Sequence, residues 1–137
     1  MRTFQLDSMS MRKIYYLNTD LDLLSSKELE PIVQAFADEA FCLYCGEEGR
    51  GHFRATFEMN RLISSPDIVM QHFCFLAESL EGDVRVLWNG CFKKVFDIGY
   101  EGGVDHASYT DELRVETLKR VAELGACIRV TVYPMEK

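Results

Sequence analysis

The sequence predicts a single α+β domain in which a mostly antiparallel sheet packs against three helices. Its 137 residues suit one domain, and a content of 47% hydrophobic and 27% charged residues is typical of a globular chain. Apolar residues recur with periods of two and of about 3.6, which indicates strands and helices in alternation. An Asn-Gly pair adds a hairpin signal, and hairpin strands pair antiparallel. The expected order is β-α-β-β-α-β-β-α-β over residues 1–137, with residues 1–11 as a loosely ordered lead-in.

The first strand is predicted at residues 13–17, where Lys-Ile-Tyr-Tyr-Leu is rich in β-forming side chains. Residues 18–20, which read Asn-Thr-Asp, are expected to form a turn. The first helix is predicted within residues 25–40. A proline past the first turn would remove a backbone hydrogen bond, so we expect this helix to begin nearer Pro31.

Paired strands are predicted at residues 41–45 and 52–59. In the second of them, apolar side chains alternate with polar ones, which is the pattern of a strand buried on one face. The connection at 46–51, Gly-Glu-Glu-Gly-Arg-Gly, is expected to be a glycine-rich acidic loop.

The second helix is predicted to begin at Ser65, which offers an N-cap oxygen and is followed by a proline at the first helical position. Apolar residues at the spacing of one buried stripe continue to Leu80. Gly82 is expected to stop this helix in a left-handed conformation.

A β-hairpin is predicted from strands at residues 84–88 and 91–98. They flank Asn89 and Gly90, and both central residues of the type I′ turn need positive φ, which Asn-Gly tolerates best.

The last helix is predicted from about Thr110 to Leu124, after a loop at residues 99–106, and Gly125 is expected to end it. Residues 126–133 complete the chain's predicted elements as a strand. Its aliphatic side chains point one way, while Arg129 and its polar neighbours point the other way.

Net charge excludes some partners. The chain has 15 Lys+Arg against 22 Asp+Glu, a formal charge of −7 at pH 7, and its pI is near 4.9. Nucleic-acid binding is not expected, because it needs Lys and Arg to neutralise phosphates. Membrane insertion is not expected either, since no apolar run approaches the roughly 18 residues of a spanning helix. The opening residues lack the apolar core of a secretion signal, so a cytoplasmic protein is expected.

Carboxylates cluster in the predicted loops and first helical turns. Such clusters are either a solvated surface or a negative face that attracts a basic partner. The residues we expect to bind such a partner are Asp20, Asp22, Glu47, Glu48, Glu101 and Asp105.

Five cysteines, an odd number, fit free buried thiols in a reducing compartment better than a disulfide framework. Cys42 and Cys45 have the Cys-x-x-Cys-Gly spacing of a zinc turn, and His52, or His72 with Cys74, could complete the ligand set. A structural zinc site normally needs four ligands, however, and residues three apart in an extended strand point to opposite faces. We therefore expect no metal, and keep a zinc- or small-ligand-binding domain as the alternative.

No complete catalytic set is found in the sequence. Asp105 and His106 could form an oriented base, but no Ser or Cys in a glycine-flanked turn accompanies them. The glycine-rich loops lack the Gly-Lys-Ser/Thr ending of a phosphate loop and carry Glu instead. We expect neither enzymatic activity nor a cofactor.

The second half of the chain resembles the C-terminal half of the bacterial domain-of-unknown-function family 4279. The resemblance lies in four segments, which read Pro66-Asp67-Ile68-Val69, Val84-Arg85-Val86-Leu87, Val121-Ala122-Glu123-Leu124-Gly125 and Val130-Thr131-Val132-Tyr133-Pro134. It implies no catalytic residues. Domains of this kind are similar in size and charge to immunity proteins encoded beside bacterial polymorphic or contact-dependent toxins.

This resemblance and the charge suggest a non-enzymatic immunity protein that neutralises a basic toxin. Such toxins are often nucleases, which must be basic to hold nucleic acid. A small acidic domain could cover the basic cleft, with fast encounter through opposite charge and slow release through buried contacts.

Overall fold

A five-stranded sheet in the order β2-β3-β1-β4-β5 forms the framework of the computed structural model, which describes residues 13–104 and 107–135. The strands are β1 (Tyr15–Ser25), β2 (Ala40–Glu47), β3 (Phe53–Met59), β4 (Lys93–Glu101) and β5 (Cys127–Tyr133). Three neighbouring pairs are antiparallel, and only β4 and β5 run parallel. The predicted α+β class with a mostly antiparallel sheet is therefore confirmed, and the predicted lead-in at residues 1–11 lies outside the described residues.

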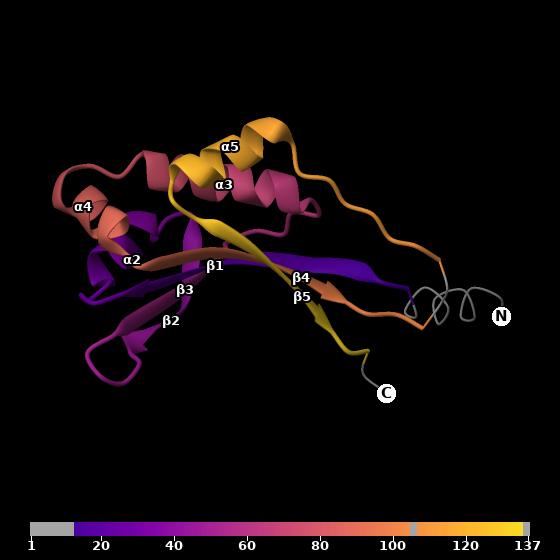
Figure 1. The fold of residues 1–137 in the computed structure, drawn as a ribbon, viewed down its shortest axis with the longest axis horizontal. Helices are drawn as coiled ribbons and strands as arrows, with labels where there is room; N and C mark the ends of the chain where they lie inside the picture. Colours follow the sequence, from indigo (N-terminus) through magenta and orange to yellow (C-terminus); the bar gives the residue numbers. More distant parts are fainter. Residues whose placement is uncertain (1–12, 105–106, 136–137) are drawn as a thin grey trace.

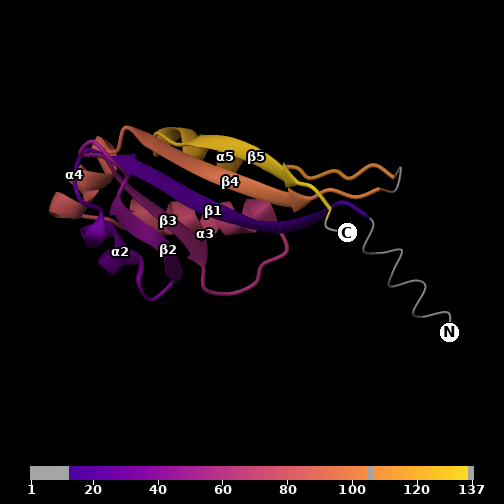
Figure 2. The same cartoon turned by 90° about the horizontal axis from the view of Figure 1, so that it is seen from below.

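Helices cover one face of this sheet. They are α2 (Glu30–Phe36), α3 (Pro66–Glu78), α4 (Gly82–Gly90) and α5 (Val115–Glu123). In Figure 1, α3 and α5 lie side by side over the strands, while α2 and α4 lie at the opposite end from the labelled chain termini. Figure 2 turns the other face of the sheet toward the viewer, with α3 behind the strands.

The core lies between the helices and the sheet. Phe36 of α2 packs edge-on against Phe57 of β3, with ring centroids 5.2 Å apart. Phe73 of α3 packs against Phe96 of β4 at 5.9 Å. These aromatic side chains are fully buried, and burial of such rings dominates the stability of a domain of this size.

The predicted turn at residues 18–20 is wrong, because β1 continues through it to Ser25. As the central strand, β1 pairs with β3 on one side and with β4 on the other. All three residues of the Asn-Thr-Asp segment pair with β4, and Asp20 also lies opposite Glu58 of β3, so strand pairing holds the segment extended. Pairing within a sheet readily outweighs a local turn preference.

The predicted hairpin is also wrong, since residues 84–88 belong to α4 rather than to a strand. Trp88 explains the difference: its side chain is fully buried, and its Nε1 donates a hydrogen bond to the Leu124 carbonyl at 3.2 Å. Gly90 ends α4 without positive φ, so no type I′ turn forms. The chain therefore has four helices and five strands in its described part, where three helices and six strands were expected.

Other predicted boundaries hold or move by a few residues. α2 starts at Glu30, which confirms a start near Pro31, and Ser65 caps α3 through a 3.2 Å hydrogen bond from the Ile68 N–H. Gly82 has the expected positive φ of 60°, but α3 has already ended and Gly82 begins α4. The last helix begins at Val115 instead of Thr110.

The late start of α5 has a local cause. Asp111, expected in the first helical turn, accepts hydrogen bonds from the hydroxyls of Tyr100 at 2.8 Å and Tyr109 at 3.3 Å. These bonds keep the preceding segment extended against β4. None of the described helices is long and apolar enough to cross a membrane.

Candidate binding site on the polar sheet face

Polar side chains gather on the face of the sheet that points away from the helices. In β1, Asp20 and Asp22 alternate with Leu21 and Leu23, which are fully buried beneath the helices. Neighbouring strands contribute further polar side chains in the same way. We call this surface the polar sheet face, and its members are Asp20, Asp22, Arg54, Thr56, Glu58, Lys93, Asp97, Arg129 and Thr131.

Three carboxylates form a row across this face. The strand register places Glu58 of β3, Asp20 of β1 and Asp97 of β4 directly opposite one another. Neighbouring strands are about 4.8 Å apart, so these side chains are within direct electrostatic reach. Arg129 of β5 stands opposite Asp97 and ends the row. We call Glu58, Asp20 and Asp97 the carboxylate row.

Asp22 is neutralised by neighbours within the protein. Its carboxylate accepts two hydrogen bonds from the Arg54 guanidinium, at 2.8 and 2.9 Å, and a third from the Thr56 hydroxyl at 3.1 Å. Asp22 is only 7% exposed, so its carboxylate is shielded from water, while the Arg54 side chain is 38% exposed. The same hydrogen bonds raise the pKa of Arg54, so its charge is permanently committed to this network.

Asp97 is also paired, because it accepts hydrogen bonds from Thr131 Oγ1 at 2.7 Å and Arg129 Nη1 at 3.3 Å. Asp20, in the middle of the row, accepts a hydrogen bond from the Asn18 amide at 3.0 Å, and no other side chain in the described part of the chain donates to it. Among the described residues, no basic side chain forms an ion pair with Asp20 or Glu58. The row therefore holds two carboxylates whose charge the described residues leave unpaired.

The environment of Asp20 raises its pKa to about 6, mainly through burial and then through repulsion by Glu58, Asp97 and Asp22. At neutral pH the group is ionised at a cost in free energy. A cation brought against it would recover this cost, so the site favours a basic group from outside the molecule.

Of the six acids predicted to bind a partner, the structure brings three together. Asp20 and Asp22 lie on the polar sheet face, and Glu48 joins them through a 3.1 Å ion pair with Arg54. Glu101 lies farther along β4 on the same face, where it accepts a 3.4 Å hydrogen bond from the Tyr15 hydroxyl. Glu47, the last residue of β2, is not in the cluster, and it accepts a hydrogen bond from the Gly51 N–H. Asp105 lies outside the described residues.

Sequence reasoning missed Glu58 and Asp97 as members of the site. The alternation in the predicted strand 52–59 already assigned Glu58 to its polar side, and Arg129 was likewise assigned to the polar side of the last strand. These signals did not reveal which strands are neighbours. Without the order β3-β1-β4, the carboxylate row across three strands could not be derived.

Cys42 and Cys45 lie on the same side of β2, not on opposite faces as expected. A β-bulge between Cys42 and Tyr44 inserts one residue, so Cys42 opposes Phe57 and Cys45 opposes Ala55. Both thiols are free and exposed, not buried as expected. Partial burial is the main cause that raises the pKa of each thiol, and the negative charge of Glu30 adds to it.

His52 does not complete a metal site with these thiols. Its ring packs against Phe92, with centroids 5.1 Å apart. His52 directly precedes β3, the strand that carries Arg54 on the polar sheet face. Among the described residues, no group of three or more His, Cys, Asp or Glu could hold a metal ion. The zinc alternative therefore has no set of ligands in the described part of the chain.

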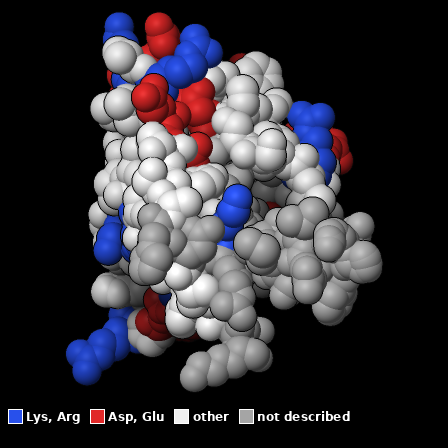
Figure 3. Space-filling view, turned by 90° about the vertical axis from the view of Figure 1, so that its right-hand side faces the viewer, with Lys and Arg blue, Asp and Glu red and all other residues white. Residues whose placement is uncertain are grey.

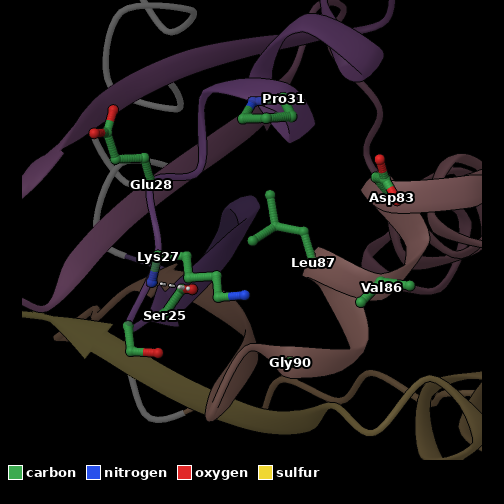
Figure 4. Close-up of a pocket in the computed structure, with 9 residues that line it drawn as sticks. Ser25, Lys27, Glu28, Pro31, Asp83, Val86, Leu87 and Gly90 are labelled. Atoms are coloured by element: carbon green, nitrogen blue, oxygen red, sulfur yellow. Dashed lines mark hydrogen bonds between the residues drawn. The ribbon is translucent and has the colours of Figure 1, made fainter.

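A cavity of about 430 Å³ lies between α4 and the segment that joins β1 to α2. Figure 4 shows Leu87 and Val86 on one wall, and Lys27 extending across toward the α4 side. Asp83 lies on the α4 wall, so opposite charges share the opening. Ser25 is engaged locally, since its hydroxyl accepts a 2.9 Å hydrogen bond from the Lys27 N–H. The cavity thus combines an apolar wall with charges of both signs and brings together no reactive pair.

Charge is mixed elsewhere on the surface. Figure 3 looks at the right-hand end of the molecule as drawn in Figure 1, and at its top, over the helices, acidic side chains lie directly beside basic ones. The net charge of −7 is therefore not spread as one uniform acidic coat over this end.

No protein family, curated protein or solved structure matches the chain. The resemblance to family 4279 consequently stays a prediction. The chemistry of the polar sheet face rests on its own residues, of which the carboxylate row is the most distinctive.

Proposed function

We propose that this protein is a non-enzymatic binding protein whose polar sheet face docks a basic protein, and that the partner is a bacterial toxin which the docking neutralises. The observation that carries the proposal is the carboxylate row: Glu58, Asp20 and Asp97 side by side on three strands, with Asp20 and Glu58 unpaired within the described residues. The prediction of an immunity protein from charge and resemblance agrees with it.

Charge balance supports a cationic partner. Four carboxylates on the polar sheet face stand against three basic side chains, those of Arg54, Arg129 and Lys93. Arg54 is already bound to Asp22 and Glu48. A Lys or Arg of a partner, seated between Glu58 and Asp20, would relieve repulsion that the folded chain otherwise bears. The gain appears only in the complex, because nothing among the described basic residues competes for these two acids.

A sheet face also suits the task mechanically. Side chains fixed on hydrogen-bonded strands lose little freedom on binding, so less of the interaction energy is spent on ordering them. A nuclease toxin presents clustered Lys and Arg where it holds nucleic acid, and a fixed row of carboxylates can cover such a cluster.

The test uses the basic product of a reading frame next to this gene, expressed in bacteria with or without this chain. Wild-type protein is expected to restore growth. The double variant Asp20→Asn/Glu58→Gln removes two charges without changing side-chain size, and its affinity for the purified toxin should fall at least about tenfold. Binding of the wild type should also weaken as salt is added.

The matched control is Glu116→Gln/Glu123→Gln, which makes the same charge change on α5, on the helical side of the sheet. This variant should neutralise the toxin as the wild type does. Equal loss in both variants would mean that only overall charge matters, and no loss in either would remove the polar sheet face as the docking site.

A further inference from the structure

The outer edge of β2 is exposed and apolar. β2 is a terminal strand of the sheet, paired with β3 on its inner side, and no strand in the described part of the chain pairs with its outer side. Phe41 is 56% exposed, Leu43 53% and Tyr44 47%. Natural edge strands discourage pairing with devices such as lysine, proline or a β-bulge, and the run from Phe41 to Gly46 has a bulge but no lysine or proline. Its only irregularity is the bulge at Leu43.

Acidic side chains frame this edge at both ends. Glu39 precedes β2, and Glu47 and Glu48 follow its last apolar residues. Glu30 of α2 is near enough to contribute to the raised pKa of both thiols of β2. The nearby basic residue Arg54 is already bound to Asp22 and Glu48. In the described sequence next to this edge, Arg50 of the β2–β3 loop is then the positive charge that remains against these acids.

These charges decide between occupants. If a second copy paired antiparallel along β2, Glu39 of one copy would stand near Glu47 of the other at both ends, and like charges across a strand pair are destabilising. A strand with an apolar centre and Lys or Arg at its ends meets no such repulsion. The other edge of the sheet is different, because β5 contains Arg129 and no acidic residue.

We propose that β2 is a site of strand addition: an extended segment of a basic partner, apolar in the middle and basic at its ends, pairs along the outer edge of β2. Backbone hydrogen bonds supply affinity in this mode of recognition, and contacts with Phe41, Leu43 and Tyr44 supply selectivity. The basic character of the partner rests on the proposed function. The edge also continues the polar sheet face, since β3, with Arg54 and Glu58, lies next to β2.

The probe is a synthetic peptide of alternating Val and Thr with two Lys at each end, and a matched peptide has Glu in place of Lys. With 15N-labelled protein, the Lys-ended peptide at millimolar concentration should shift the backbone amide signals of Phe41 to Gly46. It should bind at least about fivefold more tightly than the Glu-ended peptide.

Leu43→Lys should weaken this binding at least about fivefold, because a charged side chain then stands at the middle of the edge. Leu62→Lys is the matched control: Leu62 is an almost fully exposed leucine outside the strands, and the variant should bind as the wild type does. Thermal unfolding checks that both variants are folded.

Three results would overturn strand addition: amide signals of β2 that do not move, equal affinity for both peptides, or a dimer in sedimentation that Leu43→Lys dissociates, which would make a second copy the occupant. The proposed function fails separately. Asp20→Asn/Glu58→Gln would then leave toxin neutralisation intact even though the peptide still binds β2.

Discussion

Asp20 connects a single side chain to the pH dependence of the whole protein. Its pKa is raised from 3.8 to about 6 in the folded state, so the folded chain binds a proton that the unfolded chain has released. The contribution of this group to stability therefore falls as the pH rises from about 4 to above 6. Asp20→Asn should raise the free energy of unfolding at pH 7.5 by about 1–2 kcal/mol, and the gain should shrink toward pH 4.

Denaturant unfolding at several pH values measures this effect. Asp38→Asn serves as the control, since Asp38 is exposed in the turn after α2 and its substitution should change stability by less than about 0.5 kcal/mol at every pH. Identical pH profiles for Asp20→Asn and the wild type would contradict the strained ionisation of Asp20.

Two bidentate ion pairs are expected to differ in how much they contribute to stability, because their carboxylates differ in burial. Arg54 binds Asp22, which is nearly buried, whereas Arg120 binds Glu78 with the same geometry but on an exposed surface. Arg54→Met should cost about 2 kcal/mol, because it leaves a shielded carboxylate with less compensation. Arg120→Met should cost less than about 1 kcal/mol. Chemical denaturation of both variants compares them, and equal costs would mean that Asp22 is well solvated.

At the scale of secondary structure, the segment around Asn89 and Gly90 distinguishes a helix from a hairpin. Gly90 lacks positive φ, and a Cβ at this position would meet no atom within 4 Å. Gly90→Ala should therefore leave stability unchanged or raise it by about 0.5 kcal/mol. In a type I′ turn the same change would force Ala to positive φ and lower stability by about 1 kcal/mol.

Gly82→Ala is the matching variant at a glycine whose backbone has a positive φ. Its φ is 60°, so Ala at this position should cost about 1–2 kcal/mol even though there is open space for the methyl group. Thermal unfolding of the two glycine variants should thus show opposite or clearly unequal shifts in Tm. Equal losses would argue that residues 84–90 turn as a hairpin after all.

At the scale of the whole molecule, the fold is a two-layer structure with all four described helices on one face and the carboxylate row on the other. The helical layer is held by side chains that point into the sheet, such as Phe73 of α3 against Phe96. The described helices therefore leave the polar sheet face uncovered, as the proposed docking requires.

Two phenylalanines on α3 test this layering. Phe73 is buried against β4, and Phe75 is exposed on the same helix. Phe73→Ala should destabilise the protein by about 3–5 kcal/mol, whereas Phe75→Ala should change stability by less than about 1 kcal/mol. Denaturant unfolding measures both, and a large loss for Phe75→Ala would place an additional packing surface on the outer side of α3.

Local patterns in the sequence were sufficient for features that depend on neighbouring residues. The Ser65 cap, the helix start near Pro31, the paired strands β2 and β3 and the alternation of β5 were all predicted, because capping and side-chain period act over a few residues. Polar positions of the strands, such as Glu58, were also readable in this way.

Features that depend on contacts between distant segments were decided by the tertiary structure alone. Residues 18–20 became part of a strand because all three pair with β4 and Asp20 also pairs with β3. Residues 84–88 became a helix in which Trp88 reaches Leu124. The bulge that brings two thiols to one side of β2 and the carboxylate row across three strands arose in the same way. The physical reason is that strand order, register and burial are properties of contacts between residues far apart in the chain, and they outweigh local preferences of about 1 kcal/mol or less.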